Sequence, residues 1–311
     1  MPPDSAAPLP VAPLPVAPLP VVVNRGGGTA KTLGHKLETM IADAFAAAGQ
    51  PIDLHLVEGG EISKTIERLA GAPVVAVGGG DGTLGNAASL LHGSGSALAI
   101  LPLGTRNHLA KQLGLPATGP ADLPEIAQII AAGKRRTIDL ARAGTRIFVN
   151  NASIGIYTRL VRKRDAQAAP KWLATIPATM SVLRRLRDQH FTLTIDGQAQ
   201  DLRTAMLFIG NNRYSLESGS LGERKALDEG VLSLFAVAEK TVPQLIGFAI
   251  RAALGKVDEA RDFHVLSDAR KLIIARRRHD GITVAFDGEV ELMPVPLTVE
   301  ILPAALEVIV A

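Results

Sequence analysis

The chain has 311 residues, of which 47% are hydrophobic and 20% are charged, as in ordinary globular domains. This length predicts two domains of roughly 100–200 residues each. The chain has no cysteine, which excludes a disulfide framework and cysteine-ligated zinc, and a formal net charge of +3 is too small to indicate a nucleic-acid partner.

The first segment, Met1–Pro20, contains the repeat Ala-Pro-Leu-Pro-Val and has a proline every few residues. We therefore expect residues 1–20 to form a disordered or polyproline-II tail that takes no part in the fold. The remaining sequence has no run of 18 uncharged apolar residues, so we expect no membrane span in the folded part.

Strands and helices are predicted to alternate in the first half of the chain. Short apolar runs predict strands, apolar residues at helical spacing predict helices, and Gly49 and Gly71 end two of the helices. This alternation predicts a doubly wound parallel-sheet α/β domain over residues 21–140. The predicted strands are Val21–Val23, Ile52–Val57, Val74–Val77 and Ala97–Leu101.

After about Asp139 strand patterns dominate, with few long helical patterns between them. This favours an antiparallel β-sandwich domain over residues 141–302. The predicted strands are Arg146–Asn150, Phe191–Ile195, Arg203–Ile209, Val231–Val237, Lys271–Ala275, Ile282–Phe286 and Leu297–Leu302.

Two stretches in this second half show helical spacing of apolar residues, Trp172–Leu186 and Leu245–Leu254. Such stripes most often pack into a core, but they could also face lipid. Basic residues cluster at Arg159–Arg164, Arg184–Arg187 and Arg276–Arg278. These clusters are either a solvated face or a surface for anionic lipid head groups.

The most informative segment is Gly78–Thr83, which follows a buried strand. Glycines at such a position let the backbone approach a phosphate closely. The segment also fits G-x-G-x-x-G, but no acidic residue lies between Asp81 and Asp122 to bind a ribose, so it is not the dinucleotide fingerprint. No Lys-Ser or Lys-Thr pair follows, so it is not a P-loop.

Asp81 lies inside this phosphate-binding loop. A carboxylate there would repel phosphate unless a divalent cation intervened, so Asp81 indicates a Mg²⁺ site. The alternative is a tight turn in which Asp81 caps the following helix.

Two further loops, Asn24–Gly28 and Pro102–Asn107, follow strands of the same predicted sheet. Because ligands bind at the carboxyl ends of the strands in such sheets, we expect all three loops at one edge. In the later loop Thr105 can donate to a phosphate oxygen and Asn107 can cap the next helix. Asp287-Gly288-Glu289 ends a strand and, taken alone, reads as a hairpin turn.

Taken together, these segments resemble the catalytic domain of the diacylglycerol kinase family. The family carries a small Gly-rich turn after an Asn, then G-G-D-G-T, P-x-G-T-x-N and D-G-E, and this chain has them in that order. The resemblance covers roughly Val21 to the C-terminus and implies an ATP-dependent lipid kinase in its bacterial two-domain form.

The resemblance also implies where ATP binds. The predicted contacts lie in the three loops and the helix that follows the second: Asn24, Arg25, Gly26, Gly27, Gly28, Gly79, Gly80, Asp81, Gly82, Thr83, Leu84, Gly85, Asn86 and Thr105. Asp81 and Asp139 would belong to an aspartate–water–Mg²⁺ network, and Glu289 would be the general base for the lipid hydroxyl.

A second, structural Mg²⁺ is implied near Asp228-Glu229-Gly230, with carbonyl ligands from Ala226 and Val231. The family's last strand returns to the first domain, which here would be residues 303–311. The chain departs from the family pattern at Gly85, Asn86, His108 and Glu229.

Two other functions remain open at this point. An NAD kinase would use the same nucleotide loop, and a lipid-binding protein could keep the scaffold without turnover. For the kinase we expect a diacylglycerol-like or sphingoid lipid substrate and no nucleic-acid partner. We also expect a cytoplasmic location with peripheral contact to the inner membrane face, and an oligomeric state that could be a dimer.

Overall fold

The computed structural model describes residues 17–155, 189–214, 224, 226–237, 263–276 and 280–311. Residues 1–16 of the predicted tail, the apolar stretches Trp172–Leu186 and Leu245–Leu254, and most of the basic clusters lie outside the described residues. The chain divides into two compact units, Met1–Leu140 with Ala304–Ala311, and Ala141–Pro303. Each unit has its own hydrophobic core.

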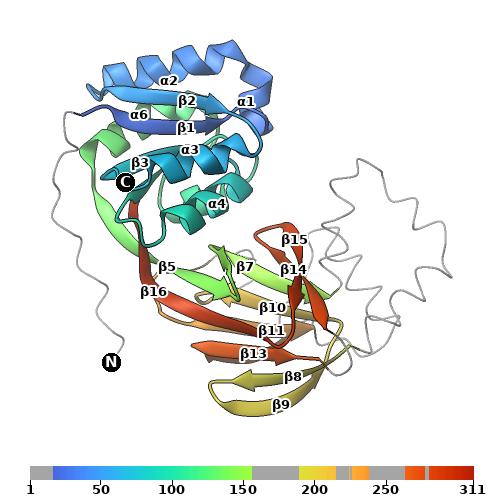
Figure 1. Cartoon of the computed structure of the whole chain (residues 1–311). Coiled ribbons are helices and arrows are strands. Elements are labelled where there is room, and N and C mark those ends of the chain that lie inside the picture. The colour runs from blue at the N-terminus through green and yellow to red at the C-terminus, as the bar shows by residue number, and fades with distance from the viewer. Residues whose placement is uncertain (1–16, 156–188, 215–223, 225, 238–262, 277–279) are drawn as a thin grey trace, which may run out of the picture. The chain divides into compact units, whose positions relative to one another are not determined.

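The first unit is built on a parallel sheet in the order β2-β1-β3-β4, with the end of β16 beside β4 (Figure 1). The first strand begins at Leu19, two residues before the predicted start, because Leu19 and Pro20 already pair with β2. The strands are β1 (Leu19–Asn24), β2 (Ile52–Val57), β3 (Val74–Gly79), β4 (Ala97–Pro102) and β16 (Leu297–Ile309).

Helices cover both faces of this sheet (Figure 1). Alternate strand residues such as Val21 and Val23 join one core with α2 and α6, while α3 packs with α4 and not with that core. The helices are α1 (Gly28–Leu33), α2 (His35–Ala47), α3 (Glu61–Leu69), α4 (Asp81–Leu91), α5 (His108–Gln112) and α6 (Leu123–Ala132), with a short 3₁₀ turn at Pro120–Asp122. This is the doubly wound arrangement that the sequence predicted.

The second unit consists of two largely antiparallel sheets. One contains the first part of β16 with β13, β8 and β9, and the other has the order β12-β11-β10-β7-β14-β15. Its strands are β5 (Arg135–Ala143, which begins in the first unit), β6 (Arg146–Phe148), β7 (Asn151–Gly155), β8 (His190–Ile195), β9 (Gln198–Arg203), β10 (Met206–Asn211), β11 (Leu232–Val237), β12 (Phe263–Ala269), β13 (Lys271–Ala275), β14 (Gly281–Phe286) and β15 (Glu289–Pro294).

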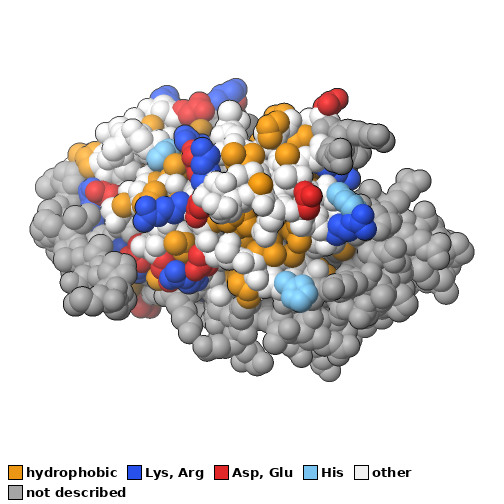
Figure 2. Space-filling model, turned by 90° about the horizontal axis from the view of Figure 1, so that it is seen from below, with side chains coloured by type: hydrophobic (Ala, Val, Ile, Leu, Met, Phe, Trp, Pro, Cys, Tyr) orange, Lys and Arg blue, Asp and Glu red, His pale blue; other side chains and the backbone are white. Residues whose placement is uncertain are grey.

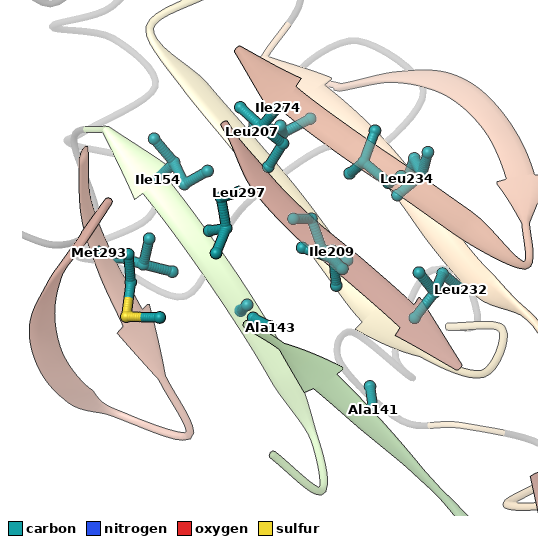
Figure 3. Packing of buried hydrophobic residues seen from close by; sticks show 14 of the residues in the cluster. Ala141, Ala143, Ile154, Leu207, Ile209, Leu232, Leu234, Ile274, Met293 and Leu297 are labelled. Carbon is teal, nitrogen blue, oxygen red and sulfur yellow. The ribbon is translucent and has the colours of Figure 1, made fainter. Parts of the chain in front are cut away.

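The two sheets of this unit pack face to face around one apolar core (Figure 3). Ile274 and Leu297 come from one sheet, and Ile154, Leu207 and Leu234 come from the other; all are buried. Alternating inward residues on two stacked sheets define a β-sandwich. The predicted fold class, a doubly wound α/β domain followed by an antiparallel β-sandwich, is therefore confirmed.

Basic and acidic side chains are interleaved with hydrophobic ones on the face of the molecule shown in Figure 2. Neither sign of charge dominates that face, in keeping with 33 basic and 30 acidic residues in the whole chain.

Candidate active site

The three predicted loops leave the carboxyl ends of neighbouring parallel strands. β3 lies between β1 and β4, with Gly78 opposite Val23 and Gly79 opposite Pro102. The loops after Asn24, Gly79 and Pro102 therefore start side by side at one sheet edge. The expected grouping of the Gly-rich segments is present within the first unit.

Asn24, the last residue of β1, ties two of these loops together. Its side-chain Nδ2 donates to Thr83 Oγ1 at 3.0 Å, and its Oδ1 accepts from the backbone N–H of Gly26 at 3.0 Å. The first loop is thereby fixed against the first turn of α4. Arg25, next to it, pairs with Glu58 at 2.9 Å and both side chains are exposed.

Glycine is required where the second and third loops meet. A Cβ on Gly104 would lie 2.5 Å from Gly80 Cα, and a Cβ on Gly79 would lie 2.7 Å from Thr83 Cβ. Real Cβ atoms do not approach so closely. The two backbones are thus in direct contact, which leaves loop amides rather than side chains at the sheet edge.

The third loop is held by Asn107, which is 2% exposed and has a left-handed backbone with φ 52°. Asn107 Oδ1 accepts from Gly104 N at 2.9 Å, and Nδ2 donates to Gly104 O at 3.0 Å and Pro102 O at 3.2 Å. The residue occupies the N-cap position of α5, but it makes no side-chain cap bond, contrary to the expectation from sequence. This inward anchoring leaves Thr105 and Arg106 exposed.

Asp81 is the first residue of α4, and the cap position belongs to Gly80, with no side-chain cap bond. The reading of Asp81 as a helix cap is therefore wrong. Its Oδ1 is buried and has no hydrogen-bond partner among the described residues. A buried carboxylate oxygen without a donor fits a hard cation, so Asp81 fits the predicted Mg²⁺.

The other predicted nucleotide contacts of α4 are engaged within the fold. Leu84 and Gly85 are buried, and Asn86 Nδ2 donates to Ser63 Oγ of α3 at 2.9 Å. Gly82 and Thr83 lie in the first turn of the helix, partly exposed, while Gly27 and Gly28 begin α1. The nucleotide contacts assigned to these residues stay predictions.

Asp139, on β5, is 2% exposed and its Oδ1 accepts from the backbone N–H of Ala304 at 2.8 Å. Ala304 has φ 49° and is the first residue of the segment that returns to the first unit. Asp139 therefore fastens this segment, a contact that sequence reasoning did not foresee. Its part in a Mg²⁺ network stays a prediction.

In the second unit, Asp287 and Gly288 form the turn of the β14–β15 hairpin, with φ 48° and 96°. The Asp287 carboxylate accepts from the backbone N–H groups of Val149, Asn150 and Asn151 at 2.8, 2.8 and 3.0 Å. The residue is partly exposed at the turn, but the carboxylate points inward and burial raises its pKa. The three hydrogen bonds from backbone N–H groups and the positive charge of Arg224 lower this pKa and so act against the effect of burial.

Glu289 begins β15 directly after this turn, and about half of its side chain is exposed (54%). Arg146 Nη2 donates to Glu289 Oε2 at 2.6 Å. The predicted base thus stands at the surface of the second unit, within reach of solvent and held by one arginine.

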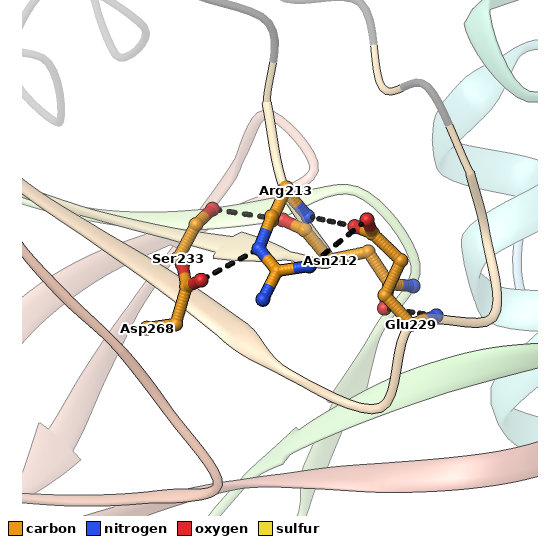
Figure 4. A network of polar contacts seen from close by, with 5 residues as sticks. All are labelled: Asn212, Arg213, Glu229, Ser233 and Asp268. Atoms are coloured by element: carbon orange, nitrogen blue, oxygen red, sulfur yellow. Dashed lines mark hydrogen bonds and ion pairs between the residues drawn. The ribbon is translucent and has the colours of Figure 1, made fainter. Parts of the chain in front are cut away.

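The predicted second metal site contains an arginine instead (Figure 4). Glu229 Oε2 accepts from Arg213 N at 2.9 Å, Oε1 pairs with Arg213 Nη1 at 3.2 Å, and Arg213 Nε also donates to Asp268 Oδ2 at 2.6 Å. The hydrogen bond to Asp268 raises the pKa of Arg213, and the charge of Glu229 adds to this effect.

Both oxygens of Glu229 are therefore occupied, and the Val231 carbonyl accepts from Asn212 N at 2.9 Å. Asp228 and Ala226 lie partly exposed beside them. In the part of the chain that the structure describes, no group of three His, Cys, Asp or Glu side chains could hold a metal. With Arg213 in this position, these residues do not fit a structural Mg²⁺.

Sequence reasoning missed the arginines of the second unit. Arg146, Arg213 and Arg224 are far from their acidic or carbonyl partners in sequence, and a single arginine carries no pattern. Arg224 is 7% exposed, and its Nη1 donates to Val149 O at 2.6 Å. A long side chain so deeply buried is rare without partners, but burial cannot be read from one sequence.

Comparison with known families identifies the class of protein. Residues 18–143 match the model of the diacylglycerol kinase catalytic domain. Residues 152–310 match the YegS C-terminal NAD kinase beta sandwich-like domain. The chain therefore belongs to the diacylglycerol kinase catalytic-domain family, in the form that carries a YegS-type C-terminal domain. It is a lipid kinase, and the resemblance inferred from its motifs is confirmed.

Individual relatives agree with this family. The chain is 28% identical to the diacylglycerol kinase of Mycobacterium tuberculosis (strain H37Rv), covering 83% of this chain and 85% of the relative. It is 28% identical to "Probable lipid kinase YegS" of Salmonella gallinarum (77% and 78% covered). A solved structure named as a diacylglycerol kinase from Bacillus anthracis has a TM-score of 0.65 at 22% identity, with 94% and 97% covered, and supports the fold alone.

No helix in the described ranges is long and apolar enough to cross a membrane.

Proposed function

We propose that this lipid kinase transfers the γ-phosphoryl group of ATP to the hydroxyl of a diacylglycerol-like or sphingoid lipid. The observation that carries the proposal is the edge of the parallel sheet, where three backbone loops start side by side and the buried Oδ1 of Asp81 has no hydrogen-bond partner among the described residues. Backbone N–H groups of the loops can donate hydrogen bonds to phosphate oxygens, and the Asp81 carboxylate can bind the Mg²⁺ that accompanies the triphosphate.

In this mechanism the loops Asn24–Gly28, Gly79–Thr83 and Pro102–Asn107 bind and orient the triphosphate. Asp81, with Asp139 as a predicted partner, would hold Mg²⁺, which neutralises charge on the phosphates when bound. Glu289 takes the proton from the lipid hydroxyl while the oxygen of that hydroxyl forms a bond to the γ-phosphorus. The bond to the bridging oxygen of ADP breaks in the same in-line step.

The experiment uses the full chain, ATP labelled in its γ-phosphate, and separate mixed micelles of diacylglycerol or sphingosine, with NAD as a soluble alternative. We expect label in the organic phase with one lipid class. Glu289→Gln is expected to lower turnover by about 10²–10⁴-fold, the usual contribution of a general base. Label on NAD instead of lipid, or parent turnover by Glu289→Gln, would contradict the proposal.

Contact with the inner membrane face and a dimeric state are parts of the same proposal that rest on the sequence. The apolar and basic segments that motivate membrane contact lie outside the described residues. Sedimentation with anionic and with neutral vesicles would measure such contact directly.

A further inference from the structure

The predicted base, Glu289, is anchored by a single short segment of the second unit. The segment Arg146–Asn151 contains β6, the turn after it and the first residue of β7. Its two ends act on different parts of the Glu289 hairpin. One end holds the backbone of the hairpin turn, and the other end holds the Glu289 side chain.

The backbone anchor is Asp287, two residues before Glu289. Its carboxylate accepts three backbone N–H groups of this segment, and its own N–H donates to Asn151 O at 3.0 Å. The carbonyls of Val149 and Asn150, in the turn between β6 and β7, also have hydrogen-bond donors. Arg224 Nη1 donates to Val149 O, and the Tyr214 hydroxyl donates to Asn150 O at 2.9 Å. A turn with its polar groups so fully bonded is held in one conformation.

The side-chain anchor is Arg146. Its Nη2 bonds Glu289 Oε2 at 2.6 Å, and its Nε lies 3.2 Å from Glu291 Oε1. The Arg146 side chain is only 26% exposed, whereas the Glu289 side chain is 54% exposed. The guanidinium thus lies between two carboxylates of β15, and the more exposed Glu289 side chain is bound to it.

We propose that Arg146 is the positioning residue of the general base: it binds Oε2 of Glu289 and leaves Oε1 to take the proton of the lipid hydroxyl. Oε1 has no partner among the described residues, so one oxygen is held and the other is free. The terminal torsion of a glutamate is broad, so an untethered carboxylate rotates between many orientations. A planar guanidinium bonded to one oxygen restricts that rotation.

This inference rests on the proposed function, because it assigns Arg146 a role only through Glu289. A surface ion pair without any role in catalysis is the alternative, and the chain offers a matched example. Arg142 lies on β5 opposite Ile147 of β6 and pairs with Glu300. Arg142→Met therefore removes a comparable ion pair from the same unit without touching the Glu289 hairpin.

The test is a double-mutant cycle on the full chain with ATP and whichever of diacylglycerol and sphingosine takes the label in the experiment described above. The single-turnover rate, kcat and KM for ATP are measured. We expect Arg146→Met to lower the rate on the order of 10–100-fold, the cost of a misplaced catalytic group. KM for ATP and the melting temperature should stay near the parent values, and Arg146→Lys should lie between. Arg142→Met should keep the parent rate.

In the Glu289→Gln background the same Arg146→Met change should alter the rate less than about 2-fold, because effects of residues that act through one another are not additive. Equal losses in both backgrounds would show a purely structural role, and a parent rate for Arg146→Met would also overturn the inference. If Arg146→Met does not fold, Arg146→Gln enters the same cycle. Failure of the proposed function has a different signature, since Glu289→Gln would then itself retain the parent rate.

Discussion

Asp81 begins α4 with one buried carboxylate oxygen that no described group donates to. If Asp81 holds Mg²⁺, Asp81→Asn should lower the rate of phosphoryl transfer on the order of 10²–10³-fold. This fold-change corresponds to a loss of several kcal/mol of transition-state stabilisation. The amide has the same size, so the melting temperature should be unchanged. Asp43→Asn, an exposed change on α2, is the matched control.

Rates for this pair should be measured over a series of Mg²⁺ concentrations. The Asp81→Asn variant is expected to need more Mg²⁺ for half-maximal rate, and Asp43→Asn should follow the parent curve. Parent kinetics in a folded Asp81→Asn protein would remove Asp81 from the metal site.

For single residues, the sequence indicated which side chains are chemically important better than it indicated which groups they contact. Asp81 stood out because a carboxylate among phosphate-binding glycines is chemically unexpected. Asp287 was read as a turn residue, and it is one, but nothing in Asp-Gly signals that its carboxylate binds three backbone amides. Arg146 and Arg213 are recognised only when strands far apart in sequence are brought together, because their partners lie at least 16 residues away.

Among the elements, the Gly-rich loops depend on direct contact between two backbones. A methyl group on Gly104 would lie 2.5 Å from Gly80 Cα, so one loop must move. We expect Gly104→Ala to raise KM for ATP and to lower kcat by at least about 10-fold, since small displacements of positioning groups cost this much or more.

Gly60→Ala provides the comparison, because Gly60 precedes α3 with φ −65° and a Cβ added there would meet no atom within 4 Å. It should leave both kinetic constants unchanged. Parent kinetics for Gly104→Ala would show that the contact between these loops does not position the nucleotide.

Arg213 links Glu229 of the Asp228–Val231 loop to Asp268. In the absence of nucleotide we therefore expect Mg²⁺ and EDTA to give the same melting temperature. Arg213→Met should lower the melting temperature by a few degrees, about 2–4 °C per kcal/mol for a unit of this size. It should also make melting respond to Mg²⁺, because Glu229 and Asp268 lose their shared cation.

The control variant removes an arginine that is paired with a single carboxylate. Arg135 pairs with Glu307 at 2.9 Å, so Arg135→Met should destabilise without any metal response. A parent protein whose melting rises with Mg²⁺ alone would restore the predicted structural metal.

In the first unit the strands β1 to β4 and the helices α2 and α3 were predictable because each has an apolar pattern of one period, whereas α6 and β5 were not predicted. In the second unit Asn151–Gly155, Gln198–Arg203, Phe263–Ala269 and Glu289–Pro294 were not recognised as strands. Gln198–Arg203 is almost wholly polar and exposed, so pairing to β8 alone makes it a strand. Such edge strands take their structure from a neighbour, which a local pattern does not contain.

For the whole molecule, the chain returns at its end to the unit in which it began. The last residues are bound to the first unit by Asp139 to Ala304 N, by Arg135 to Glu307, and by pairing of Val308 with Leu98 of β4. Leu306, Val308 and Ile309 are at most 3% exposed. No local pattern places this segment, since its partners lie 165–210 residues earlier in the chain.

The two ends of the chain should therefore differ sharply in their effect on stability. Burial of three apolar side chains contributes roughly 5 kcal/mol or more, which is comparable with the total stability of a domain. A chain truncated after Pro303 should lose cooperative melting of the first unit and all kinase activity. Deleting residues 1–16, whose proline-rich composition cannot build a core, should leave melting and activity near the parent values.

Both variants can be followed by calorimetry and by hydrogen exchange at the amides of β3 and β4. Protection there should vanish on C-terminal truncation and persist on N-terminal truncation. Retained protection without Ala304–Ala311 would mean that the returning strand is dispensable for the nucleotide unit.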